Sequence, residues 1–121
     1  MWKGKVPASK NTDFTFEQFD KMENGVRAGL YLLSKYIIDY GLVTIPQIIS
    51  RFCPDSSQYE YCRYIYRNSF LRFDTKIDTR NKLFVLARQM MRLESLFVCD
   101  VDMLSRAFMT LPSCYINYFK V

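Results

Sequence analysis

Residues 16–52 constrain the fold more than any other stretch, because their hydrophobic spacing and turn residues together predict a helical hairpin. Five hydrophobic residues recur at spacings of three and four: Met22, Val26, Leu30, Leu33 and Ile37. This spacing places them on one face of a long α-helix. Gly41 stands where a helix C-cap is expected, and Thr44 can cap a second helix with Pro46 in its first turn. The second helix is expected to end at Phe52.

Two further helices are expected next in the chain. The third begins at residues 55–58, Asp-Ser-Ser-Gln, where a short acceptor is followed three residues later by glutamine as in a capping box. It is expected to run to about Asn68. The fourth helix is expected over residues 80–96, capped by either Asp78 or Thr79.

A fifth helix and a hydrophobic tail complete the pattern. The helix starts at Asp100 or Asp102 and ends before Pro112, since proline cannot continue a helix. The tail, residues 114–119, is expected to form either a final strand or a docked extension.

The predicted fold class is mainly α: one compact domain of about five helices, residues 14–121, preceded by an irregular N-terminal arm, residues 1–13. Phenylalanine alternates with polar residues over residues 14–17, which predicts a short extended segment before the first helix. The chain of 121 residues has the length of a single domain.

Composition limits the partners that the chain can have. No hydrophobic run approaches the ~18 residues of a membrane-spanning helix, and the N-terminus has no apolar stretch typical of a signal peptide. The net charge is +5, but the basic residues are scattered with no run of three. A solvated basic surface is therefore favoured over nucleic-acid binding.

The residue types also exclude several chemistries. The chain contains no histidine, so Ser–His and Cys–His catalysis is excluded, and its four glycines form no phosphate loop. None of the four cysteines forms a C-x2-C pair: Cys53, Cys62, Cys99 and Cys114. No metal and no cofactor is expected. The cysteines are interpreted as buried free thiols, and two disulfides are the alternative in an oxidising setting.

The third helix is unusually rich in tyrosine and arginine. Six of these residues, including one in the following loop, are candidate partner-binding residues: Tyr59, Tyr61, Arg63, Tyr64, Arg67 and Arg72. Such residues stack on bases or sugars, and they are also enriched at protein interfaces. Alternatively, they form an aromatic core with arginine stems packed over it. Four residues are expected to face inward: Tyr59, Cys62, Ile65 and Tyr66.

Four groups of short motifs occur in order over residues 2–109. They are Trp2-Lys3-Gly4; Phe16-Glu17-Gln18-Phe19 with Asn24-Gly25-Val26-Arg27-Ala28; Gly41-Leu42-Val43-Thr44-Ile45 with Ile48-Ile49-Ser50-Arg51 and Pro54; and Leu86-Ala87 with Met90-Met91-Arg92-Leu93-Glu94. They resemble the W-x-G, F-x-x-F, G-[IV]-R-A, G-L-x-T-[IV]-x-x-I-I-x-R-W-x-P and A-M-I-R-H-E motifs of a family of small phage and prophage virion-associated structural proteins, some of which are lysozyme-like.

The chain departs from this family at three places. The Asn-Pro-Gly-Asn segment that precedes W-x-G in the family has no counterpart here. Leu93 stands in place of the histidine of R-H-E, and residues 55–58 replace an acidic, asparagine-rich turn. The resemblance thus implies a lysozyme-like helical scaffold that lacks part of its cleft.

A glycosidase on this scaffold would need two carboxylates about 5–10 Å apart, one of them with a raised pKa. Glu94 is the candidate catalytic acid, because it matches the family motif and lies at the boundary of the fourth helix's hydrophobic face. Asp55 or Glu23 is the candidate second carboxylate.

Three hypotheses for function follow. The first is a phage-derived, virion-associated structural or interaction protein without strong catalysis, which binds another protein. The second is a peptidoglycan-cleaving glycosidase that uses Glu94. The third is a phage-encoded inhibitor that binds a host defence protein. The partner is accordingly a virion component, a host factor or peptidoglycan, and the expected location is the virion or the host cytoplasm.

Overall fold

The computed structural model of the chain describes residues 22–53, 56–95 and 99–121. In these ranges the elements are α1 (Met22–Ser34), the π-helical turn η3 (Lys35–Asp39), α2 (Ile45–Phe52), α3 (Gln58–Asn68), α4 (Arg80–Ser95), α5 (Val101–Phe108) and α6 (Ser113–Tyr118). The described residues form no strand, so the predicted mainly helical fold is confirmed. The predicted N-terminal arm and the extended segment that follows it lie outside the described residues.

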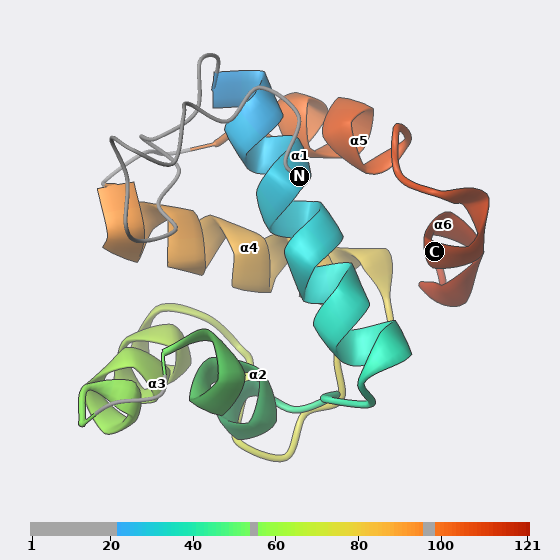
Figure 1. Cartoon of the computed structure of the whole chain (residues 1–121). Helices are drawn as coiled ribbons and strands as arrows, with labels where there is room; N and C mark the ends of the chain where they lie inside the picture. The colour runs from blue at the N-terminus through green and yellow to red at the C-terminus, as the bar shows by residue number, and fades with distance from the viewer. Residues whose placement is uncertain (1–21, 54–55, 96–98) are drawn as a thin grey trace, which may run out of the picture.

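Helix α1 lies at the centre of the molecule and crosses α4 (Figure 1). It packs against both α4 and α5, while α2 and α3 pack against each other and α3 also contacts α4. Four of the five residues predicted for the buried face of α1 and its extension are fully or almost fully buried: Val26, Leu30, Leu33 and Ile37. The side chain of the fifth, Met22, is not described. Gly41 ends this first helical segment with a φ of +70°, which glycine adopts without steric cost.

Local capping chemistry fixes where three of the helices begin. At α2, Gln47 Oε1 accepts hydrogen bonds from the backbone N–H of Thr44, at 3.2 Å, and of Val43, at 3.0 Å. At α5, a carboxylate oxygen of Asp100 accepts from the backbone N–H of Met103 at 2.7 Å. Thr44 is thus the predicted N-cap of α2, and of the two predicted starts of α5, Asp100 and Asp102, Asp100 is the N-cap.

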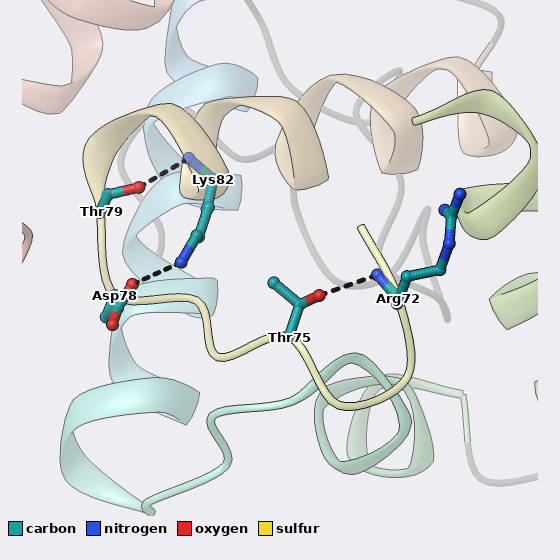
Figure 2. A network of polar contacts seen from close by, with 5 residues as sticks. All are labelled: Arg72, Thr75, Asp78, Thr79 and Lys82. Atoms are coloured by element: carbon teal, nitrogen blue, oxygen red, sulfur yellow. Dashed lines mark hydrogen bonds and ion pairs between the residues drawn. The ribbon is translucent and has the colours of Figure 1, made fainter. Parts of the chain in front are cut away.

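Thr79 and Asp78 were the two predicted caps for α4, and each of them makes a different contact with Lys82. Thr79 Oγ1 accepts from the backbone N–H of Lys82 at 3.2 Å, so Thr79 is the cap. Asp78 instead accepts from Lys82 Nζ at 3.0 Å, and Figure 2 shows both contacts. This hydrogen bond from Lys82 holds the pKa of the Asp78 carboxyl below its usual value.

The C-terminal tail is a docked extension, and its strand alternative is wrong. Residues 113–118 form α6, whose Tyr115 is buried, and Phe119 follows it into the core. Only one residue pair, Thr79 and Lys120, makes a bridge of the parallel β type within the described part of the chain. The Tyr115 hydroxyl donates a hydrogen bond to a carboxylate oxygen of Asp39 at 2.7 Å, and this bond holds α6 against η3.

No disulfide joins any two of the four cysteines, and their exposures differ. Cys99 is buried, Cys53 and Cys62 are half-buried, and Cys114 is exposed. The interpretation of all four as buried thiols was therefore wrong for Cys114, which lies exposed in the first turn of α6.

Candidate functional site

The candidate site is an open groove of about 480 Å³ between α3 and the C-terminal end of α4. Nine residues line it: Ser57, Glu60, Tyr61, Arg63, Tyr64, Arg67, Asn68, Leu93 and Glu94. The structure thus brings Glu94 together with four of the six predicted partner-binding residues. Most of the nine lining residues belong to α3, and Leu93 and Glu94 line the groove from α4.

Tyr61 and Glu94 meet at the inner side of this groove. Tyr61 is only 6% exposed, and Glu94 is half-buried. Burial raises the pKa of Tyr61, and the nearby negative charge of Glu94 raises it further, so the phenol stays protonated. The Tyr61 hydroxyl and the Glu94 carboxylate therefore lie close enough to interact directly.

The rim of the groove is charged and aromatic. Arg63 Nη1 lies 3.8 Å from a carboxylate oxygen of Glu60, and the Arg63 guanidinium lies 5.5 Å from the centre of the Tyr59 ring. Arg67, one turn further along α3, is exposed. The groove therefore offers two guanidinium groups and one carboxylate to a partner at its outer edge.

The predicted inward face of α3 was wrong for Tyr59, which is 68% exposed. Tyr61 and Ile65 are the buried residues of this helix, while Cys62 and Tyr66 are half-buried. The reason is that α3 contacts both α2 and α4, and its contact face is centred on Tyr61 and Ile65, four residues apart. Tyr61 is thus a buried residue at the inner side of the groove, and Tyr59 is a surface residue.

Arg72 lies outside the groove and stabilises the end of α3. Its Nη1 donates to the carbonyl oxygens of Tyr66 at 3.2 Å, Ser69 at 3.2 Å and Leu71 at 2.9 Å. The last carbonyls of a helix have no partner within the helix, so the bond to Tyr66, in the last turn of α3, acts as a C-terminal cap, while the bonds to Ser69 and Leu71 hold the turn that follows. As a partner-binding residue, Arg72 stays a prediction that this geometry does not favour.

Of the predicted carboxylates, Glu94 and Glu23 lie in different hollows. Glu23 lines a second hollow, of about 250 Å³, which is formed by residues of α1 and α5 together with Thr110. Asp55 lies outside the described residues. The carboxylate that shares the groove with Glu94 is Glu60, which sequence analysis did not single out. The sequence did indicate Glu60, because Glu60, Arg63, Tyr64 and Arg67 follow the spacing of one helix face.

This arrangement can bind a polar or charged partner. The described residues contain no group of three cysteine, aspartate or glutamate side chains that could hold a metal ion. Over the same residues, no helix has the length and hydrophobicity to cross a membrane. Aromatic and arginine side chains at a groove edge are the composition of protein-interaction hot spots.

Comparison with known proteins finds a similarity to a phage protein. No protein-family model matches the chain. The chain is similar to Protein P5 of Pseudoalteromonas phage PM2, with 39% identity over 55 residues. These residues are 46% of this chain and 33% of Protein P5, so the similarity spans about a third of the relative's length. The chain therefore resembles a phage protein, whereas the lysozyme-like part of the family resemblance gains no support and stays a prediction.

Proposed function

We propose that this chain is a structural protein of a phage or prophage, that it is associated with the virion, and that it binds another protein of the particle. The observation that carries the proposal is the 39% identity with Protein P5 of phage PM2. The family motifs over residues 2–109 independently favour the same class of protein.

The groove between α3 and α4 is the surface that we assign to this interaction. Arg63 and Arg67 extend its positive edge, and Tyr64 lies between them on the same helix. Arginine and tyrosine together contribute charge-assisted hydrogen bonds and a large rigid contact area. A partner surface with acidic side chains therefore fits this edge.

The test uses particles purified from a host in which the encoding phage or prophage multiplies. Mass spectrometry of these particles is expected to find the chain at a constant copy number per particle. Arg67→Glu is expected to lower that number, because it reverses a charge at the groove edge. Arg106→Glu is the matched control, since Arg106 is also an exposed arginine and lies on α5, outside the groove. Absence of the wild-type chain from washed particles would refute the proposal.

A second candidate function is cleavage of peptidoglycan by Glu94. The observation that favours it is the half-buried position of Glu94 in a groove beside the protonated Tyr61. Purified cell walls would then lose turbidity when the protein is added, and Glu94→Gln would abolish the loss. Glu60→Gln distinguishes the two carboxylates of the groove. No loss at high protein concentration would exclude this function.

A further inference from the structure

The loop between α3 and α4 carries two exposed phenylalanines. Phe70 is 53% exposed and Phe73 is 66% exposed, while Leu71 between them is fully buried. Scattered single hydrophobic residues are common on protein surfaces, but here two large aromatic side chains three residues apart are both exposed on one short loop. Neither phenylalanine lines the groove described above.

The loop that presents them is held by hydrogen bonds at its first half. Ser69 Oγ donates to the carbonyl oxygen of Ile65 at 2.6 Å and accepts from the backbone N–H of Leu71 at 3.2 Å. The Nη1 atom of Arg72 donates to the carbonyl oxygens of Ser69 and Leu71 in the same turn and to that of Tyr66 in α3. The backbone on both sides of Phe70 is therefore fixed.

The second half of the loop is fixed in the same way. The backbone N–H of Arg72 donates to Thr75 Oγ1 at 3.0 Å, as Figure 2 shows. The backbone N–H of Thr75 donates in turn to the Arg72 carbonyl at 3.1 Å. Two residues later, Ile77 donates its N–H to the carbonyl of Val43 at 2.9 Å and buries its side chain completely. Phe73 thus stands on a closed turn between two anchored residues.

A rigid loop with exposed aromatic side chains is suited to binding a partner with a preformed pocket. Ordering a flexible loop on binding costs affinity, and a preorganised loop avoids most of that cost. Phenylalanine side chains that enter a pocket bury a large apolar area for few rotatable bonds. The loop therefore has the physical properties of an interface anchor.

The charges around the loop indicate the chemistry of the partner. Residues 67–76 carry three positive charges, on Arg67, Arg72 and Lys76, and one negative charge, on Asp74. A protein pocket with acidic side chains on its rim complements this set. An anionic lipid surface fits less well, because exposed Asp74 is adjacent to Phe73 and would be repelled.

We propose that Phe70 and Phe73 form a two-residue anchor that inserts into an apolar pocket, rimmed by acidic side chains, on another protein of the particle. This inference rests on the proposed function, because that function makes the partner a protein of the particle. It adds a contact site separate from the groove and names the chemistry of the pocket.

The experiment replaces Phe70 or Phe73 with the photoreactive analogue p-benzoylphenylalanine in the full chain, expressed while the encoding phage or prophage multiplies. After illumination, mass spectrometry maps the crosslinked peptides in purified particles and in lysed cells. Crosslinks from both positions are expected to fall on one segment of one other protein, with apolar residues and neighbouring acidic ones. Met109, which is 59% exposed after α5, carries the analogue in the control.

Each outcome decides a different question. Crosslinks to lipid, to a second copy of this chain, or to scattered proteins as often as from Met109 would overturn the anchor. Absence of the chain from particles would overturn the proposed function, while a single acidic-rimmed partner in lysed cells would still support the anchor. Phe70→Ser and Phe73→Ser are each expected to lower the crosslinking yield of the other position about tenfold, the effect of losing one hot-spot residue.

A further variant separates preorganisation from contact. Thr75→Val removes the hydroxyl that accepts from Arg72 but keeps both phenylalanines. The variant is expected to crosslink the same segment with lower yield. An unchanged yield would show that loop rigidity does not contribute to binding.

Discussion

Replacing Tyr115 with phenylalanine removes the hydroxyl that joins α6 to η3 and leaves the ring in place. The hydroxyl donates to Asp39 at 2.7 Å, and Tyr115 is only 5% exposed. Its ring also meets the Tyr31 ring edge-on at 5.6 Å, a contact that phenylalanine keeps. The variant therefore isolates the contribution of a single long-range hydrogen bond to stability.

The size of the effect follows from the geometry. A hydrogen bond to a charged acceptor contributes about 1.5–3 kcal/mol. The Asp39 side chain is 39% exposed and also lies 3.9 Å from Lys35 Nζ, so screening favours the lower end of this range, about 1.5 kcal/mol. For a chain of this length, the unfolding entropy of about 2.1 cal/mol/K per residue converts that loss into a Tm lower by roughly 6 °C.

Thermal and urea unfolding, followed by circular dichroism, measure this change. Tyr118→Phe is the matched control, because Tyr118 is in the same helix but is 41% exposed. A double-mutant cycle with Asp39→Ala is expected to show a coupling energy of about 1 kcal/mol between the two side chains. A loss of stability in Tyr115→Phe no larger than in Tyr118→Phe would refute the reasoning.

Four further predictions concern the pH dependence of stability, the ends of α3 and α5, and the turn at Gly41. Burial and Asp39 raise the pKa of Tyr115 above its usual 10.0, so the contribution of Tyr115 to stability is complete below pH 10.0 and is lost above it. In alkaline urea titrations the free energy of unfolding should therefore fall by up to about 1.4 kcal/mol per pH unit, and less steeply in Tyr115→Phe. Asp100→Ala should cost about 1 kcal/mol in urea unfolding through loss of the α5 cap, whereas Asp102→Ala should not. Arg72→Met should lower the urea midpoint by removing the donor to the Tyr66 carbonyl of α3 and to two carbonyls of the turn after it, with an expected loss of roughly 1–2 kcal/mol, and an unchanged midpoint would contradict this. Gly41→Ala should cost about 1 kcal/mol from its positive φ alone, since an added Cβ would meet no atom within 4 Å; Gly41→Asn should lose less.

Features that depend on neighbouring residues in the sequence were predictable. The caps at Thr44, Thr79 and Asp100 follow from a short acceptor placed before a hydrophobic repeat, and the structure confirms all three. The buried face of α1 follows from its hydrophobic spacing for the same reason. In each case the physical cause lies within one or two helical turns of the residue concerned.

Features that depend on distant contacts were not predictable. Aromatic residues occupy so many positions of α3 that spacing alone does not determine which of Tyr59 and Tyr61 is buried. The contacts of α3 with α2 and α4 determine that Tyr61 is the buried residue. The role of Arg72 likewise depends on the path of the loop, which returns its guanidinium to the end of α3. In the groove, Glu60 was overlooked although its spacing from Arg63 and Arg67 was visible in the sequence.

The π-helical turn at residues 35–39 has a consequence for comparing related sequences. In such a turn, a backbone N–H bonds to the carbonyl five residues earlier, as Tyr40 does to Lys35, instead of four. The turn therefore contains one residue more than an α-helix of the same form. A homologue that lacks this residue would continue α1 as a regular helix, so sequence alignments should allow a one-residue gap between positions 35 and 40. The same homologue would also shift the side chain that meets α6, and substitutions at the positions of Asp39 and Tyr115 should then change together.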